Sequence, residues 1–273
     1  MIHMKIGAYE LADNKTHVMG ILNVTPDSFS DGGRFVTMDK VIEHANLMMQ
    51  EGAAIIDVGG ESTRPGYTMI SADEEISRVV PAIEAIKSRL DIAVSIDTYK
   101  STVAEAAICA GADMVNDIWG LMYDKKMARL IKRYDVSVTL THNKTKGEYN
   151  NFEEDVIAEM KKICESAEKN GIAHDKIIVD PGIGFAKSTE QNLLVMKNLD
   201  DFVALGYPVL VGASKKSFIG NTLSLPVDER LEGTLATTAV SVEKGARFVR
   251  VHDVKENVRL IKMLESIKDA GNH

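Results

Sequence analysis

Short apolar runs alternate with longer amphipathic stretches along this sequence. The runs are rich in β-branched residues, and the stretches between them carry apolar residues at i, i+3 and i+4 with charges between. Near-continuous apolar strands that alternate with helices are typical of a parallel sheet covered by helices. The eight predicted strands are His17–Asn23, Ala53–Gly59, Ala93–Asp97, Met114–Asp117, Ser137–His142, Ile177–Asp180, Pro208–Gly212 and Phe248–His252.

Two architectures fit eight such units: a closed (β/α)₈ barrel and an open, doubly wound sheet. No GxGxxG motif follows an early strand, which disfavours an open dinucleotide-binding sheet. Several predicted helices end at glycine, as at Gly52 and Gly111, and the next strand begins within a few residues. No linker or low-complexity tract divides the chain. We therefore predict an α/β fold, a single-domain (β/α)₈ TIM barrel over residues 1–273.

Charge and composition narrow the function classes. A net charge of -8 argues against nucleic acid and anionic lipid as partners, and no apolar run approaches the roughly 20 residues of a membrane span. The N-terminus lacks the apolar core of a signal peptide. Cys109 and Cys164 lie far apart in helix-like stretches, so we expect buried, reduced thiols. Together these features predict a cytoplasmic protein.

Polar residues gather where the predicted strands end. One such residue after a strand is more often a helix cap or turn residue than a ligand. In a barrel, however, all the carboxyl-end loops share one mouth, so eight polar strand ends favour an active site there. The strand ends are Asn23, Glu61–Arg64, Asp97, Asn116–Asp117, His142–Asn143, Asp180, Ser214–Ser217, and Arg250 with His252.

The polar groups of this rim fall into two chemical sets, with a neutral oxygen donor at Asn23. The first set suits a flat heterocycle with a guanidine-like edge and consists of Asp97, Asn116 and Asp180. The second set is cationic or potentially so and suits phosphate or carboxylate oxygens; it consists of Lys216, Arg250 and His252. Mg²⁺ accepts an oxygen such as that of Asn23 beside phosphates and water.

Two of the strand-end loops are long and rich in glycine, residues 25–35 and 59–68. They are either ordinary flexible connections or lids that fold over a ligand and exclude water. We favour lids, because the other loops that follow strands are short.

Seven motifs stand in the order of one known family: MGILNVTPDSFSDGG, DVGGESTRPG, SIDT, NDI, DPGIGF, KKSFIG and RVHDV. From about Val18 to the last helix, the sequence resembles bacterial dihydropteroate synthase. The resemblance implies a (β/α)₈ barrel that condenses 6-hydroxymethyl-7,8-dihydropterin pyrophosphate with p-aminobenzoate in folate biosynthesis, using Mg²⁺. It also implies a homodimer through the late helices.

The same resemblance implies a role for each matching residue. Pterin binding falls to Asp97, Asn116, Asp180 and Lys216, with Arg250 stacking on the ring. The residues implied to bind the diphosphate are Asn23, Arg250 and His252, and Asn23 would also reach the metal. The p-aminobenzoate site, where sulfonamides would compete, falls to Phe29, Thr63, Pro65, Phe185, Lys216 and Ser217. Catalytic roles fall to Asp31, Asp97, Asp180, Lys216 and Arg250, with Asp31 on the departing pyrophosphate.

Two positions depart from the family pattern. Thr141 stands where the family commonly has methionine, so either the pocket is repacked or the hydroxyl finds a hydrogen bond. Lys215 stands where the family usually has arginine, which keeps the charge but loses any bidentate contact. Neither departure removes a residue that the chemistry requires.

Two other functions remain open for such a barrel. A corrinoid-type, pterin-dependent methyltransferase has a similar barrel, but would have no reason for the TPDSFSDGG loop or for Lys216–Phe218. A non-catalytic barrel that binds pterin as a sensor would tolerate loss of Asn23, Asp97 or Arg250, and all three are present. Pyrophosphate release that depends on p-aminobenzoate and Mg²⁺ separates the three functions.

Overall fold

The computed structural model describes residues 4–25, 38–61 and 69–271. The strands are β1 (Met4–Ile6), β2 (Tyr9–Leu11), β3 (His17–Asn23), β4 (Ile55–Gly59), β5 (Ala93–Asp97), β6 (Met114–Asp117), β7 (Ser137–Thr141), β8 (Ile177–Asp180), β9 (Leu210–Val211) and β10 (Phe248–Val251). The helices are α1 (Met38–Glu51), α2 (Ala72–Arg89), α3 (Ser101–Cys109), α4 (Met127–Tyr134), α5 (Phe152–Lys169), α6 (Thr189–Lys197), α7 (Leu199–Val203), α8 (Ser217–Leu223), α9 (Leu231–Glu243) and α10 (Val254–Asp269), with short 3₁₀ turns at His174–Lys176 and Val227–Glu229.

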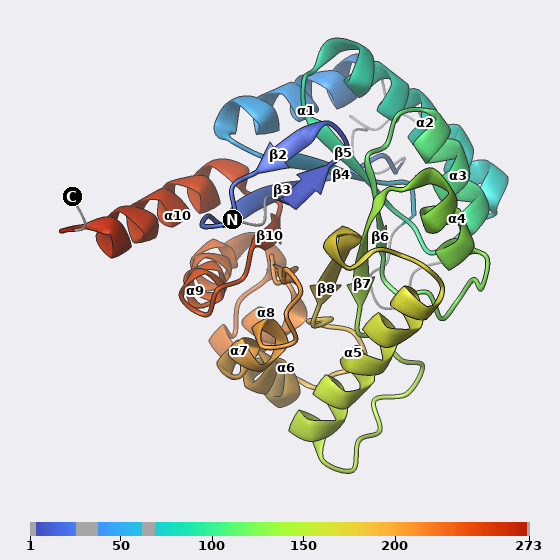
Figure 1. Cartoon of the computed structure of the whole chain (residues 1–273). Coiled ribbons are helices and arrows are strands. Elements are labelled where there is room, and N and C mark those ends of the chain that lie inside the picture. Colours follow the sequence, from blue (N-terminus) through green and yellow to red (C-terminus); the bar gives the residue numbers. More distant parts are fainter. Residues whose placement is uncertain (1–3, 26–37, 62–68, 272–273) are drawn as a thin grey trace.

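Strands β3 to β10 form a parallel barrel with helices around it (Figure 1). The neighbouring strands follow the order β8-β7-β6-β5-β4-β3-β10-β9, and a parallel bridge between Val179 and Val209 joins the two ends. The predicted (β/α)₈ barrel is therefore confirmed. The predicted bounds of β3, β5, β6 and β8 match the structure, whereas β9 is shorter than predicted. Gly52 and Gly111, predicted to end helices, have φ of 103° and 112°, a backbone conformation that favours glycine.

Alternation along the strands divides the core into two parts. Residues that point outward, such as Val58, Ile96 and Val179, pack with the inner faces of the helices. Residues that point inward at the amino-terminal end of the barrel form a second cluster, which includes Met19 and Phe248. Burying one such side chain stabilises the fold by about 1.5–3 kcal/mol. This packing holds the strand ends, and thus the rim, in fixed positions.

A two-stranded hairpin closes the amino-terminal end of the barrel, near the N-terminus in Figure 1. β1 pairs with β2 in antiparallel register, and Met4, Ile6 and Leu11 pack on the inward cluster. This hairpin was not predicted from the sequence, because three-residue strands are too short to show a reliable period. The hairpin leaves the carboxyl ends of the strands as the mouth of the barrel.

The cysteine prediction was half wrong. Cys164 is buried in α5, as expected, but Cys109 is exposed at the end of α3. Both thiols are free. Among the described residues, no helix is long and apolar enough to cross a bilayer.

Candidate active site

Polar side chains line the upper interior of the barrel because the strand pleat turns alternate residues inward. On β5, Ala93 belongs to the inward apolar cluster, so Ser95 and Asp97 point inward above it. The register sets Asp97 beside Asn116 and Thr141 beside Asp180. Residues separated by many tens of positions in the chain therefore meet on one interior surface.

Arg250 joins two buried carboxylates at the centre of this surface. Its Nε lies 2.5 Å from Asp57 Oδ2, and its Nη2 lies 2.6 Å from Asp97 Oδ2. Asn116 Nδ2 donates to the same Asp57 oxygen at 3.1 Å. The contacts bring three predicted site residues together and add a fourth group, the Asp57 carboxylate, that the sequence analysis missed. The sequence does mark Asp57, because it is a charged residue in the middle of an apolar strand and a buried charge needs a partner.

Six buried polar atoms inside the barrel have no hydrogen-bond partner among the described residues. An unsatisfied buried polar group costs about 1–3 kcal/mol, so such a cluster is typical of a site that awaits a ligand. Three of these atoms are carbonyl or carboxyl oxygens and three are hydroxyls, which suits a flat ligand rich in N–H donors. The atoms are Asp57 Oδ1, Asp97 Oδ1, Asn116 Oδ1, Ser95 Oγ, Thr139 Oγ1 and Thr141 Oγ1.

Glycines at the rim leave space between the polar groups. A methyl group at Gly59 would lie 3.4 Å from Asn23 Oδ1 and 3.9 Å from Asp97 Oδ2. One at Gly212 would lie 3.7 Å from Asp180 Oδ2. Both glycines stand at barrel positions where any side chain would project among the site groups.

The other side of the site joins the β8 end to the start of α8. Asp180 Oδ1 accepts a hydrogen bond from Gly182 N at 2.7 Å. Lys216 Nζ donates to the Ile183 carbonyl and lies 4.6 Å from the centroid of the Phe185 ring. This contact unites the predicted residues Phe185 and Lys216.

Burial shifts the pKa values of the charged groups in opposite directions. Desolvation raises the pKa of Asp97 to about 7, although the Arg250 guanidinium opposes the shift. Desolvation also raises the pKa of the Asp180 carboxyl, against the effect of Lys216. Desolvation lowers the pKa of Lys216 to about 8, against the effect of Asp180. Such opposed shifts in one concave site are typical of functional groups.

Replacing Asp97 with asparagine is expected to change how stability depends on pH. The folded protein holds the Asp97 pKa above the unfolded value of about 3.9, so it binds the proton more tightly than the unfolded chain. The stability from this group is present below about pH 4 and is lost as pH rises through about 7. Urea unfolding between pH 4 and 7.5 should therefore show the free energy of unfolding of the wild type falling relative to that of the variant. Parallel curves would contradict the assignment.

His252 lies at the rim beside the end of β9. Its Nδ1 is 3.0 Å from Ser214 Oγ, and its backbone N–H donates to the same hydroxyl at 3.2 Å. Lys215, which stands where the family usually has arginine, pairs with Asp253 at 2.9 Å. Ser217 is exposed at the first turn of α8, next to Lys216.

Other polar strand ends have structural partners, in agreement with the cap or turn alternative. Asp117 accepts from the N–H groups of Trp119 and Leu121, and Asn143 donates to the Ile118 carbonyl. Glu61 accepts from Ile70 N, Tyr99 Oη and Lys100 Nζ, which fixes the segments on either side of residues 62–68. Four predicted site residues lie outside the described residues: Phe29, Asp31, Thr63 and Pro65.

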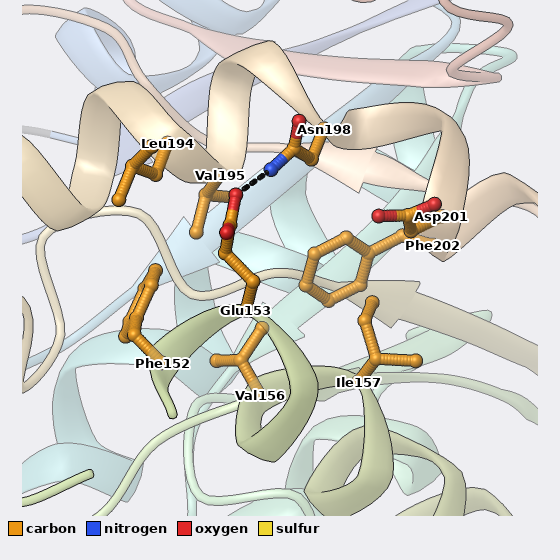
Figure 2. A pocket seen from close by; sticks show the side chains of 9 residues that line it. All are labelled: Phe152, Glu153, Val156, Ile157, Leu194, Val195, Asn198, Asp201 and Phe202. Carbon is orange, nitrogen blue, oxygen red and sulfur yellow. Dashed lines mark hydrogen bonds between the residues drawn. The ribbon is translucent and has the colours of Figure 1, made fainter. Parts of the chain in front are cut away.

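A separate pocket lies on the outer helical layer and is not this site (Figure 2). Residues of α5, α6 and α7 line it, mostly with apolar side chains such as Phe152 and Phe202. One polar contact, from Asn198 Nδ2 to Glu153 Oε1, crosses it. Because it contains none of the barrel-mouth groups, it has no part in the chemistry considered below.

Known proteins match the chain over nearly its whole length. Residues 19–252 match the family described as pterin binding enzyme. The dihydropteroate synthase of Clostridium beijerinckii is 54% identical over 97% of this chain and 99% of its own. The crystal structure of dihydropteroate synthase from Clostridium difficile in the presence of pteroic acid is 48% identical, with a TM-score of 0.90 over 93% of this chain and 97% of the other. That of Xanthomonas albilineans with 4-aminobenzoic acid is 36% identical, with a TM-score of 0.91 over 95% of each chain.

Proposed function

Since this chain belongs to the pterin binding enzymes and, within them, to the dihydropteroate synthases, we propose that it joins 6-hydroxymethyl-7,8-dihydropterin pyrophosphate to p-aminobenzoate at the barrel mouth. The products are 7,8-dihydropteroate and pyrophosphate. The observation that carries this proposal is the set of acceptors and hydroxyls inside the barrel that have no partner in the described part of the chain, above all the Asp57, Asp97 and Asn116 oxygens. A pterin ring presents the flat shape and the N–H donors that these atoms lack.

The deep part of the barrel would take the pterin. Asp180 would face the guanidine-like edge of the ring, while Asp97 and Asn116 bind its other polar atoms. Arg250 uses two of its five N–H groups on Asp57 and Asp97, so the remaining donors can reach the pterin or the diphosphate. The arginine would thereby connect the ring site to the leaving group.

The diphosphate and p-aminobenzoate would bind nearer the rim. We assign the diphosphate to Asn23, Arg250 and His252, and the p-aminobenzoate to the side where Lys216 lies over Phe185. Ser217 extends this side at the surface. The proposal includes the loop residues Phe29, Asp31, Thr63 and Pro65. Sulfonamides, which resemble p-aminobenzoate, would compete there.

The reaction would proceed by loss of pyrophosphate before the new bond forms. Breaking the C–O bond leaves a cation delocalised into the pterin ring, which the carboxylates of Asp97 and Asp180 stabilise. The lone pair of the p-aminobenzoate nitrogen then forms the C–N bond, and the nitrogen loses a proton. No covalent intermediate with the enzyme is required.

A magnesium ion fits this site as a partner of the diphosphate. Among the described residues no group of three His, Cys, Asp or Glu side chains is arranged to hold a metal ion by itself. Mg²⁺ usually keeps water and binds through one or two protein oxygens and substrate phosphates, and Asn23 offers one neutral oxygen. When bound, the ion would neutralise charge on the leaving pyrophosphate.

The proposal extends to the assembly and its location. The late part of the chain presents exposed apolar side chains at Leu223, Val227, Met263 and Ile267, which supports a homodimer through these helices. Two free cysteines are typical of a reducing cytoplasm. Sedimentation of the purified chain tests the dimer, because a monomer at micromolar concentration would contradict it.

The deciding experiment is an assay of pyrophosphate release with the purified chain, the pterin pyrophosphate, p-aminobenzoate and Mg²⁺. We expect release that needs all three additions. Methyl transfer without such release would favour the methyltransferase alternative. Pterin binding with no turnover would favour a non-catalytic barrel.

Replacing Thr141 with valine is expected to weaken pterin binding without weakening the fold. The hydroxyl is buried beside Asp180 and has no partner among the described residues, so a hydrogen bond to the pterin of about 1 kcal/mol would be lost. We expect KM for the pterin pyrophosphate to rise about fivefold, while the thermal midpoint stays level or rises. An unchanged KM would favour the alternative that the pocket is simply repacked around the smaller side chain.

A further inference from the structure

A chain of three polar side chains, with a buried histidine at its centre, lies behind the p-aminobenzoate side of the site. Lys187 Nζ is 2.9 Å from His142 Nδ1, and His142 Nε2 is 2.8 Å from Glu159 Oε2. These residues come from the end of β7, from α5 and from the loop between β8 and α6. His142 is one of the polar strand ends at the predicted rim, but none of the three residues was predicted to bind substrate or to act in catalysis.

When Lys187 is protonated, the contacts determine which histidine nitrogen donates and which accepts. An ammonium can only donate, so His142 Nδ1 accepts from Lys187 and the proton on Nε2 is donated to Glu159. His142 is therefore neutral. Burial lowers its pKa to about 4, and the charge of Lys187 acts in the same direction. Burial also lowers the pKa of Lys187 to about 7, against the effect of Asp180. The neutral histidine therefore links the amino group of Lys187 to the carboxylate of Glu159.

Lys187 also binds three backbone carbonyl oxygens. Its Nζ lies 3.2 Å from the His142 carbonyl, 3.1 Å from that of Gly182 and 3.2 Å from that of Phe185. With His142 Nδ1 these make four acceptors around a group that has at most three N–H donors, so the acceptors share its protons. Two of the carbonyls belong to the loop of residues 181–187, so Lys187 closes this loop on itself as well as against the end of β7.

The loop is held closely at other points and carries a residue of the proposed site. Gly182 has φ of 73°, and a methyl group there would lie 1.9 Å from the His142 carbonyl oxygen, so the two loops touch through backbone. Asn192 Oδ1 accepts from Gly184 N at 2.7 Å. Between these points the loop presents the Phe185 ring to Lys216 Nζ.

We propose that Lys187, held by His142 and Glu159, is a positioning residue that sets the loop of residues 181–187 and so places Phe185 against Lys216 for p-aminobenzoate. The inference rests on the proposed p-aminobenzoate site. It differs from a purely structural role, in which the cluster would stabilise the fold but leave the preference between the two substrates unchanged.

The test is steady-state kinetics of Lys187→Met, which keeps the length of the side chain and removes its donors. We expect KM for p-aminobenzoate to rise about tenfold, while KM for the pterin pyrophosphate and kcat change less than about threefold. A fall in thermal midpoint with both KM values unchanged, or an equal rise in both, would overturn the proposal.

A double-mutant cycle with Phe185→Ala asks whether Lys187 acts through the ring. We expect the double variant to have the p-aminobenzoate KM of Phe185→Ala alone, because a misplaced ring and a missing ring lose the same contact. Effects that multiply would overturn the proposal while leaving the p-aminobenzoate site intact. If Phe185→Ala itself leaves this KM unchanged, the assignment of Phe185 in the proposed function fails, and the inference fails with it.

A substitution at Glu159 tests the same link while leaving Lys187 in place, and the Glu159 side chain is 35% exposed. Glu159→Leu removes the anchor of His142 and is expected to raise the p-aminobenzoate KM about threefold. Glu159→Gln still offers an oxygen to His142 Nε2 and should restore it to the wild-type value. If both substitutions leave this KM unchanged, Glu159 has no part in placing the loop and the proposed three-residue link is wrong.

Discussion

Asp180→Ala is expected to lower turnover about 100-fold or more while the barrel stays folded. The Asp180 carboxylate is buried at the end of β8, where it would face the pterin as positive charge develops on the ring. A charge contact that strengthens in the transition state contributes about 2.7–4 kcal/mol to the barrier. Steady-state pyrophosphate release measures the loss.

Asparagine at the same position is the matched control. It keeps an oxygen for the Gly182 N–H group and removes only the charge. We therefore expect a similar loss of turnover but a thermal midpoint close to that of the wild type. Turnover near the wild-type value in both variants would refute the role of Asp180.

Replacing Arg250 with methionine is expected to abolish turnover and to lower the free energy of unfolding by about 3–5 kcal/mol, because it removes one partner of a buried ion pair. The variant leaves the buried carboxyl groups of Asp57 and Asp97 without the guanidinium that pairs with both of them. Lysine should not rescue the variant, since one ammonium cannot reproduce a planar group that contacts two carboxylates. Urea unfolding at pH 7.5 measures the loss.

Arg247, which directly precedes β10, offers a control for the Arg250 variant. Its guanidinium lies 3.4 Å from Asp13, and its side chain is 28% exposed. Arg247→Met should cost less than about 1 kcal/mol, since partly exposed pairs contribute little. Equal losses in the two variants would mean that Arg250 does not neutralise the buried carboxylates.

The order of strands and helices could be predicted from the sequence because the strands of a parallel barrel are buried on both sides. Its strands have helices on one side and packed side chains on the other, so they appear as near-continuous apolar runs bounded by turns. Four of the eight strands therefore had the predicted bounds. The first hairpin carried no such signal, because its strands have three residues each.

The convergence of polar residues at the barrel mouth could also be predicted from the sequence. Parallel strands end on one side of a barrel, so Asp97, Asn116, Asp180 and Arg250 were expected to converge. The structure brings them together. The same rule did not separate site residues from Asp117 and others that bind backbone groups, because the order of residues does not show which groups a side chain meets.

The sequence by itself determined the barrel, its mouth and the polar residues at that mouth, since strand period and strand ends are local properties of a chain. Only the tertiary structure decided which groups are partners. Arg250 and Asp57 lie 193 residues apart in the chain, yet one hydrogen bond joins them. The Thr141 hydroxyl, which has no partner within residues 4–25, 38–61 and 69–271, and the acceptors around Lys187 likewise depend on side-chain direction across several strands. Hydrogen-bond partners are set by distances in space, and those distances exist only once the barrel has closed.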